Sequence, residues 1–591
     1  MGRLTRLLQR ALPMAALLIV AAAPDPQHGR ASSGSASDPR PSPNTIEAWR
    51  NRKFGMFIHF GLYSMAGGMW NGRRIDNGYS EQILANGKLP PAAYAALARR
   101  FDPRKFDPDA IVALAKAAGM KYIVITAKHH DGFNLFATKT TSYNVVDATP
   151  YHRDIVGAMA TACRRGGIAF GVYYSTIDWH HPGGNRYIPG NSNPITPAQE
   201  AFNVAQLKEL LSNYGPISEL WFDMGRPTPA QSAHFARTVH ALQPETMVSG
   251  RVWNHQGDFT VMGDNGEPNV AVEEPWESPA SIYPETWGYR SWQVRTDLSG
   301  KIREHIGRLV RVVSAGGNYI LNIGPTGDGA VVPFEGAVLK GIGAWLTVHG
   351  EAIYGTRAQP FPKLDFGYAT LGDHRLYLFV ERMPADGRLR LPGIVDTHFG
   401  TASVLGQSRG NGVAVTTDTR GALIDTKGLP GLAPENFMPV VVIPVIGDLH
   451  VRPPSVAPDR DKQAHLTPAN GDRFLRHDGF GYDAPAKIYK MRWDVALGPG
   501  TYALTLRYRP PAHAARVGLV VDGHAQILSL NRQGRSRAVV RRDTGRAPYA
   551  LRLEINPAPP RSRADHLPVS LLGADIAPHD GLPSGKSGYR R

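Results

Sequence analysis

The chain has 591 residues, too many for one hydrophobic core, so we expect two to four domains. With 42% hydrophobic and 9% aromatic residues, its composition is that of a folded globular protein and not of a disordered chain. The net charge of +16 lies mostly near the ends, with +3 in residues 1–50 and +9 in residues 501–591, which argues against a nucleic-acid-binding core.

Residues 1–23 have the pattern of a secretory signal peptide. Arg3, Arg6 and Arg10 precede the apolar run ALPMAALLIVAAA, which ends in small residues. This run is shorter than the ~20 residues that a membrane-spanning helix needs, so we expect an exported protein, periplasmic or secreted, without a membrane span. Residues 24–43 are rich in Pro, Ser and Gly and predict a disordered linker.

Residues 44–350 alternate short apolar runs with longer amphipathic stretches. Apolar positions recur every three or four residues in PDAIVALAKAAGM and PAQEAFNVAQLKELLSNYG, which predicts helices. The expected strands are FGMFIHFG, YIVITAKHH, IAFGVYYS, ISELWFDMG, TMVSGR, NVAVEE and NYILNIGP. Strands that alternate with helices pair in parallel, so this region predicts an α/β fold, a (β/α)₈-like barrel.

The remaining chain changes pattern to short segments of period two, punctuated by Gly and Pro. Residues 351–447, with HRLYLFVERM and LRLPG, predict an antiparallel β-sandwich. Residues 448–580, with TYALTLRYRP, VGLVVDG and YALRLEIN, predict a second β-sandwich of unknown role. Residues 581–591 are expected to be a disordered tail.

Polar side chains follow the apolar runs of four successive expected strands. His59, the pair His129 and His130, Tyr173 and Asp223 all stand at the carboxyl ends of their runs. Barrel enzymes build their sites at this rim, because the loops that follow the strands open there. These residues therefore predict one shared pocket.

The histidine pair of KHHDGFNLF permits three interpretations. It could hold a metal ion with Asp131 and His59, but no HExxH motif and no cysteine cluster supports this. Either histidine alone could be a hydrogen-bonded core residue. As a third interpretation, the pair binds the hydroxyl groups of a sugar, which the many aromatic residues in or beside the rim segments favour. These aromatic residues are Trp70, Phe133, Tyr173, Tyr174, Trp221, Trp276 and Trp287.

A glycosidase also needs two carboxyl groups, about 5 to 5.5 Å apart if it retains the anomeric configuration. Asp223 is one candidate, although an aspartate at a strand end can instead cap the next helix. Glu277 is the favoured second carboxyl, because the neighbouring Trp276 would desolvate it and raise its pKa. Glu267, Glu273, Glu274 and Glu285 of the same region remain alternatives.

Five segments in this order and spacing resemble the α-L-fucosidases of glycoside hydrolase family 29. They are KFGMFIHFGLYS, KHHDGFNLF, ELWFDMG, ETWGYRSW and GGNYILNIGPTGDG, and the resemblance covers about residues 44–446. It implies a retaining exo-hydrolase that removes terminal α-L-fucose from fucosylated glycans by double displacement, with no metal and no organic cofactor.

By the same resemblance, Asp223 is the nucleophile and Glu277 the acid/base, with Glu274 and Glu267 as alternatives. The substrate-binding residues that it implies are His59, Trp70, His129, His130, Tyr173, Trp221, Arg251 and Trp287. Two departures are visible, Met224 before Gly225 where many relatives have glycine, and the segment GDFTVMGDN. The linkage preference and the oligomeric state stay open.

Three other functions compete with a fucosidase. A retaining glycosidase could act on a related sugar such as an L-galactoside. A silent relative could bind fucose without turnover. A metal-dependent hydrolase could use the histidine pair and Asp131.

Overall fold

The computed structural model describes residues 40–182, 191–267, 272–361, 363–407, 412–429, 431–432, 436–452, 454–475, 488–542, 550–557, 567 and 570–579. The predicted signal peptide, most of the predicted linker and the predicted tail lie outside the described residues. None of the helices in the described part is long and apolar enough to cross a membrane.

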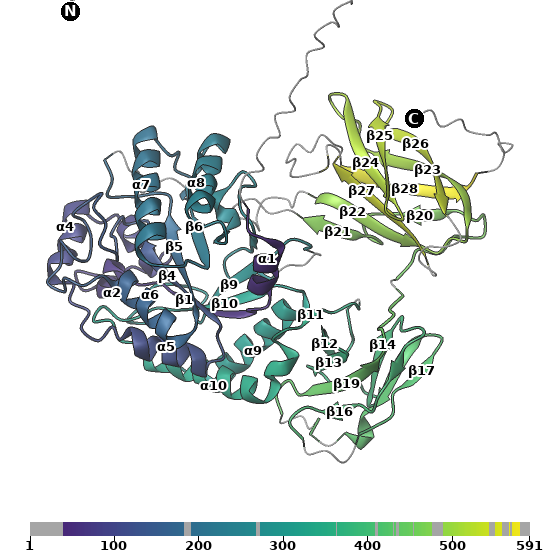
Figure 1. Cartoon of the computed structure of the whole chain (residues 1–591), viewed down its shortest axis with the longest axis horizontal. Coiled ribbons are helices and arrows are strands. Elements are labelled where there is room, and N and C mark those ends of the chain that lie inside the picture. Colours follow the sequence, from purple (N-terminus) through teal and green to yellow (C-terminus); the bar gives the residue numbers. More distant parts are fainter. Residues whose placement is uncertain are drawn as a thin grey trace, which may run out of the picture. The chain divides into compact units, whose positions relative to one another are not determined.

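Eight parallel strands form one sheet in which chain order and spatial order agree (Figure 1). They are β1 (Phe54–Ile58), β4 (Tyr122–Lys128), β5 (Ala169–Ser175), β6 (Glu219–Asp223), β7 (Met247–Val248), β8 (Thr260–Val261), β9 (Trp276–Ser281) and β10 (Asn318–Ile323). β10 pairs with β1, and a parallel bridge between Ser249 and Phe259 joins the ends of the sheet next to β7 and β8. The sheet is therefore a closed ring, and the predicted barrel class is confirmed.

Helices follow six of the eight strands, and most start at a side-chain cap. Asp107, Asp154, Thr196, Thr228 and Asp297 each accept a backbone N–H of the first helical turn. The helices are α5 (Pro108–Ala117), α6 (Ile155–Gly166), α7 (Pro197–Asn213), α8 (Pro229–Leu242), α9 (Leu298–Ser314) and α10 (Pro333–His349). In the described chain no α-helix follows β7 or β8, and only the short η4 (Gly250–Val252) follows β7.

Short elements fill the ends of the barrel. α1 (Pro43–Arg50) precedes β1, and the connection from β1 to β4 carries a small hairpin and several helical turns. These are α2 (Leu62–Ala66), β2 (Met69–Trp70), β3 (Arg73–Arg74), η1 (Ser80–Gln82), α3 (Ile83–Asn86), α4 (Pro91–Ala95) and η2 (Ala96–Arg100).

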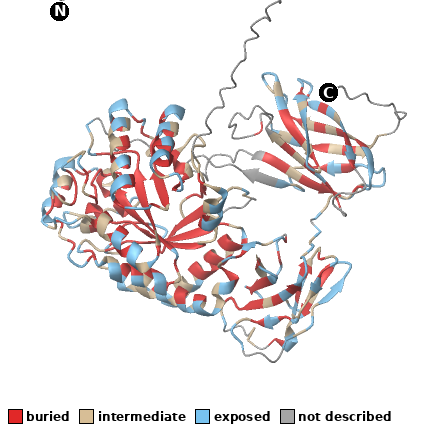
Figure 2. Ribbon diagram, viewed as in Figure 1, coloured by how far each residue is buried: buried red, intermediate tan, exposed pale blue. Residues whose placement is uncertain are grey.

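The barrel strands are almost entirely buried, whereas the later strands alternate between buried and exposed residues (Figure 2). Because side chains alternate along a strand, Glu219, Trp221 and Asp223 of β6 share one face and form three successive levels inside the barrel. The expected strand NVAVEE is wrong for residues 272–274, which are not a strand; residues 269–271 lie outside the description. β9 instead begins at Trp276.

After η5 (Gly350–Ala352) the named strands pair only antiparallel. Two sheets over one core contain β11 (Arg357–Ala358), β12 (Gly367–Gly372), β13 (Arg375–Val380), β14 (Arg388–Pro392), β15 (His398–Phe399), β16 (Ser403–Val404), β17 (Thr416–Asp418), β18 (Gly421–Asp425) and β19 (Val440–Ile446), with the turn η6 (Thr426–Gly428).

Two further sheets enclose a separate core. Their strands are β20 (Ala464–Leu466), β21 (Asp472–Leu475), β22 (Ile488–Val495), β23 (Gly500–Tyr508), β24 (Ala515–Val521), β25 (His524–Leu530), β26 (Arg535–Arg542), β27 (Leu551–Pro557) and β28 (Leu571–Pro578). The β-sandwich class predicted for the region after the barrel is confirmed.

Candidate active site

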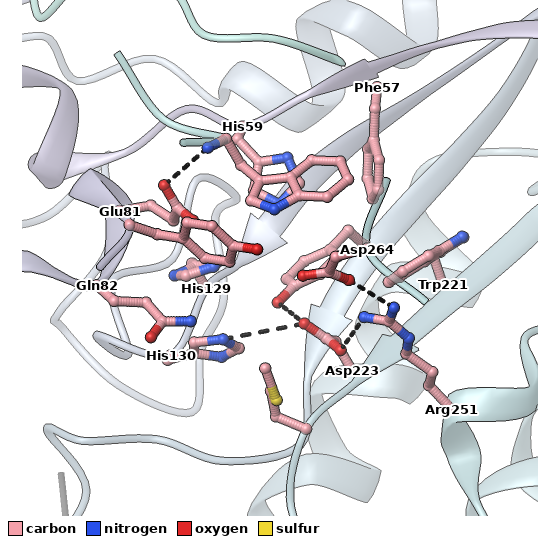
Figure 3. Close-up of a pocket in the computed structure, with 14 residues that line it drawn as sticks. Phe57, His59, Glu81, Gln82, His129, His130, Trp221, Asp223, Arg251 and Asp264 are labelled. Carbon is pink, nitrogen blue, oxygen red and sulfur yellow. Dashed lines mark hydrogen bonds and ion pairs between the residues drawn. The ribbon is translucent and has the colours of Figure 1, made fainter. Parts of the chain in front are cut away.

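A pocket of about 300 Å³ lies at the carboxyl ends of the barrel strands (Figure 3). Its lining consists of Phe57, His59, Tyr79, Glu81, Gln82, His129, His130, Tyr173, Trp221, Asp223, Met224, Arg251, Asp264 and Trp287. Eight of the residues predicted from the sequence are among them: His59, His129, His130, Tyr173, Trp221, Asp223, Arg251 and Trp287. The structure thus brings together residues spread over more than 220 positions of the chain.

Trp70 was also predicted for the pocket, but the structure does not place it in the lining. It is half-buried in the two-residue strand β2, where it pairs with Arg73 of β3. Trp70 packs against the large hydrophobic core cluster of the barrel, as one of its partly buried neighbours.

Asp223 ends β6 and is held from two sides. Its Oδ1 accepts a hydrogen bond from Arg251 (2.9 Å), and its Oδ2 accepts one from the Tyr173 hydroxyl (2.7 Å). Nε2 of His130 lies 3.9 Å from Oδ2. With its side chain 8% exposed, the carboxylate is fixed in position and still open to a ligand.

Asp264 is the second aspartate of the lining, and the sequence interpretation did not select it. It stands three residues after β8 and accepts a hydrogen bond from Nη2 of Arg251 (2.7 Å). Burial alone would lower the pKa of Arg251, but the two carboxylates raise it above its usual value. The signal for Asp264 was present in FTVMGDN, an apolar run that ends in a polar residue, as at the other rim strands.

Glu277 is not part of the pocket, which corrects the sequence interpretation. It is the second residue of β9, level with Asn318 at the start of β10, and therefore lies at the opposite end of the barrel from Asp223. Its side chain is completely buried and accepts hydrogen bonds from Tyr122 (2.5 Å) and Trp221 (2.8 Å). Burial and the nearby Glu219 raise its pKa, but no bound sugar could reach it.

The two alternative acids do not line the pocket either. Glu267 makes a bidentate ion pair with Arg311 of α9, in which Nε and Nη2 of the arginine donate to the two carboxylate oxygens at 2.7 and 3.0 Å. Glu274 is half-buried in the segment before β9. Of the four carboxyl groups that the resemblance implied as catalytic residues or alternatives, only Asp223 lines the pocket.

The hydrogen-bond network sets the proton positions of two histidines. Asn322 donates its amide N–H to the Trp287 carbonyl, so its oxygen accepts from Nδ1 of His59 (2.8 Å). Ser175 donates to the Ile177 carbonyl and accepts from Nδ1 of His130 (2.7 Å). In each ring the other nitrogen, Nε2, is then left as a hydrogen-bond acceptor.

Burial lowers the pKa of both His59 and His130 to about 3, so both rings are neutral near pH 7. His129 is buried beside them, and its Nδ1 has no hydrogen-bond partner in the described part of the protein. Three neutral imidazoles with free acceptor or donor atoms suit the hydroxyl groups of an uncharged ligand. Within the described ranges no group of three or more His, Cys, Asp or Glu side chains is arranged to hold a metal ion.

Glu81 is a further lining residue that the sequence interpretation missed. Its Oε2 accepts hydrogen bonds from the backbone N–H groups of Trp287 (3.1 Å) and Gly288 (2.8 Å) and thereby holds the Trp287 loop at the rim. Burial raises the pKa of Glu81 to about 7. It comes from η1, in a connection without a recognisable strand end, so the alternation of strands and helices gave no signal for it.

A family model described as alpha-L-fucosidase matches residues 25–351. Tissue alpha-L-fucosidase from Bos taurus is 31% identical over 420 residues, which cover 67% of this chain and 87% of that protein. The Homo sapiens tissue enzyme is 32% identical over 392 residues, covering 62% and 82% of the two chains. The family-model match ends at residue 351, directly after the last barrel helix.

Solved structures agree with this assignment. The chain is similar to an alpha-L-fucosidase from Vibrio sp. strain EJY3, with a TM-score of 0.65, 26% identity, and coverage of 91% of this chain and 98% of that one. It is also similar to a GH29 alpha-L-fucosidase from Bacteroides thetaiotaomicron, trapped as a covalent intermediate with 2-fluoro-fucosyl fluoride, with a TM-score of 0.62, 28% identity, and coverage of 70% and 99%. The chain belongs to the α-L-fucosidases of glycoside hydrolase family 29.

Proposed function

We propose that the enzyme releases terminal α-L-fucose from fucosylated glycans with retention of the anomeric configuration, with Asp223 as nucleophile and Asp264 as acid/base. The observation that carries the proposal is that both carboxylates line one pocket and bind one guanidinium, that of Arg251. A retaining glycosidase needs such a pair of neighbouring carboxyl groups.

The two aspartates differ in depth, which supports the division of roles. The side chain of Asp223 is 8% exposed and that of Asp264 is 18% exposed. The group that leaves the sugar must extend toward solvent, so its proton donor belongs nearer the pocket mouth. The nucleophile belongs below the ring, where Asp223 lies.

In the first step an oxygen of Asp223 forms a bond to the anomeric carbon while the glycosidic C–O bond breaks. Asp264, protonated, gives its proton to the departing oxygen, which leaves as an alcohol. In the second step a water molecule attacks the anomeric carbon and Asp264 takes up its proton. The ester bond to Asp223 breaks and fucose leaves with its original configuration.

The other lining residues support recognition of a 6-deoxy sugar. Nε2 of His59 and of His130 can each accept a sugar hydroxyl, and leaving such a buried group unpaired costs ~1 to 3 kcal/mol. Met224, Phe57 and Trp287 offer apolar surface for the methyl group of fucose. The same surface disfavours an L-galactoside, which carries a hydroxyl there.

We also propose that the enzyme is exported, on the sequence pattern of residues 1–23. An exported enzyme would meet fucosylated glycans outside the cytoplasm.

The decisive experiment is to trap the intermediate. Incubation with 2-fluoro-fucosyl fluoride, followed by proteolysis and mass spectrometry, should place one fluorofucosyl group on the peptide that contains Asp223. The Asp223→Asn variant should remain unlabelled, and the Glu267→Gln variant, altered outside the pocket, should label like the wild type. A label on any other carboxylate, or an inverted product by NMR, would contradict the proposal.

A further inference from the structure

Two buried carboxyl groups lie beneath the pocket, at the opposite end of the barrel from Asp223. Glu219 is the first residue of β6 and Glu277 the second of β9, and both are fully buried. Glu219 accepts a hydrogen bond from the Trp49 indole (2.6 Å). Glu277 accepts one from Tyr122 and one from Trp221. The proposed chemistry uses neither carboxyl group.

The barrel makes room for this cluster with two glycines. A Cβ atom at Gly55 of β1 would lie 2.3 Å from the Tyr122 ring, and one at Gly171 of β5 would lie 2.8 Å from Cγ of Glu219. Both contacts are closer than real Cβ atoms make. The polar groups therefore occupy sites that the neighbouring strands leave open for them.

The charges of the cluster balance if the two carboxyl groups share one proton. Arg52 is half-buried nearby, and desolvation lowers its pKa while the charges of Glu219 and Glu277 oppose that change. Burial raises the pKa of Glu219, and burial together with the charge of Glu219 raises the pKa of Glu277. One guanidinium and one carboxylate then leave the second carboxyl neutral.

Trp221 connects this cluster to the site. Its indole N–H donates to Glu277 below, and its ring faces the pocket above. The Arg251 guanidinium lies 4.8 Å from the ring centre, and the Tyr173 ring stacks on it with centroids 5.8 Å apart. These two residues are the ones that hold Asp223.

We propose that Glu277 is a positioning residue, which fixes the Trp221 indole from below and through it the two groups that hold Asp223. The inference rests on the proposed function, because it assumes that catalysis depends on the position of Asp223. An indole N–H can only donate, so Oε2 of Glu277 must accept from it whether or not Glu277 is protonated. Any proton on Glu277 is then on Oε1, facing the Tyr122 hydroxyl.

This geometry separates a positioning role from an acid/base role. In Glu277→Gln the amide oxygen can still accept from Trp221, and the amide N–H can donate to Tyr122, so kcat should stay within about 3-fold of the wild type. Glu277→Met keeps the volume but leaves the indole N–H without an acceptor. We expect its kcat/KM to fall on the order of 10- to 100-fold, by the same factor for a 2,4-dinitrophenyl fucoside and for a fucosyl disaccharide.

A double-mutant cycle tests whether the effect passes through Trp221. Once Trp221→Phe has removed the N–H, adding Glu277→Met should cost less than about 3-fold in kcat/KM. Tyr319→Phe is the control for lost buried hydroxyls, since it breaks the bond to Nδ1 of His305 (2.8 Å) away from the pocket. It should lower the melting temperature and leave kcat/KM unchanged.

Each other result overturns the inference. Equal losses in Glu277→Gln and Glu277→Met, with activated fucosides spared, would make Glu277 an acid/base. A lower melting temperature with normal kcat/KM in Glu277→Met would make its role purely structural. Additive losses in the cycle would exclude Trp221 as the link. Failure of the proposed function is distinguishable, because it would appear as a missing label on Asp223 in the unaltered enzyme.

Discussion

Asp223 and Asp264 accept hydrogen bonds from the two terminal nitrogens of one guanidinium, that of Arg251. The contacts are 2.9 and 2.7 Å, and Figure 3 shows the guanidinium between the two carboxylates. Arg251 itself follows β7, the strand that lies between the strands of the two acids. One side chain therefore sets the spacing of the groups that the proposed reaction requires.

Replacing Arg251 by lysine should show how much this shared contact matters. A lysine ammonium is a point charge on a flexible stem and cannot present a planar fork to two carboxylates. We expect Arg251→Lys to lower kcat on an aryl fucoside on the order of 100-fold while the protein stays folded by circular dichroism. Steady-state kinetics with p-nitrophenyl α-L-fucoside measures the loss.

Arg311→Lys is the matched control. Arg311 also binds a carboxylate through two nitrogens, but its partner is Glu267, outside the pocket. Its substitution should leave kcat near the wild-type value. Equal activity in the two lysine variants would remove Arg251 from the site chemistry.

Substitution of Asp264 should make the rate depend on the leaving group. Asp264→Ala removes the proposed proton donor, so natural fucosides should lose several orders of magnitude in kcat/KM. A 2,4-dinitrophenyl fucoside, whose leaving group needs no proton, should still form the intermediate. Added azide should then speed turnover and give the α-linked fucosyl azide, identified by NMR.

The corresponding Asp223→Ala variant provides the contrast. Without the nucleophile, azide must attack the substrate directly and give the β-linked azide. Glu267→Ala should change neither rates nor products. A uniform loss on both kinds of substrate in Asp264→Ala would be evidence against its assignment as acid/base.

The stability of the protein should depend on pH through Glu335. Burial raises the pKa of this carboxyl from 4.5 to about 8, even though the Gly324 N–H donates to it at 3.0 Å. Between these values the folded protein keeps a proton that the unfolded chain releases, so Glu335 makes the fold less stable as the pH rises. Glu335→Gln keeps the acceptor and removes the titration.

The free energy of unfolding of Glu335→Gln minus that of the wild type should therefore grow by about 1.4 kcal/mol per pH unit from pH 5 to pH 8, and level off above it. Urea unfolding at intervals of one pH unit measures this difference, in which contributions of other buried groups cancel. Glu351→Gln, an exposed carboxyl substitution, should give a curve parallel to the wild type. A constant difference for Glu335→Gln would refute the prediction.

Gly55 should be intolerant of any side chain. Its hypothetical Cβ overlaps three atoms of the Tyr122 ring at 2.3 to 2.5 Å, so Gly55→Ala forces Tyr122 away from Glu277. We expect a loss of ~1 to 3 kcal/mol in the free energy of unfolding, measured by chemical denaturation. Gly498→Ala, where no atom lies within 4 Å of the new methyl, should be neutral.

Local sequence patterns were sufficient to predict the barrel and one half of the site. The runs that end in His59, His130 and Asp223 are strands whose ends meet at one rim, because all parallel strands of a barrel point the same way. Each of these three residues could be placed at the rim without knowing which strands are neighbours.

The second carboxyl could not be found in this way. Glu277 follows the expected strand NVAVEE, which would put it at the rim, but β9 begins at Trp276 and puts it at the base. β9, with the sequence WESPAS, contains a proline and several polar residues, and β8 has only two residues, so neither shows the pattern of a strand. Their positions are set by the pairing of β9 with β10 and of β8 with β9. A shift of a few residues in the start of β9 therefore moves Glu277 from one end of the barrel to the other.

In the described residues no α-helix follows β7 or β8, so the proposed catalytic residues fall into two groups that are supported differently. Asp223 lies within β6, where it pairs with Ser175 of β5, whereas Arg251 and Asp264 lie outside the strands, in a stretch with only one helical turn in its described part. Exchanging the loops after β7 and β8 in an engineered enzyme would therefore change the surroundings of the proposed proton donor, and with them the acceptor molecules that the site tolerates. The strand that carries the proposed nucleophile would stay unchanged.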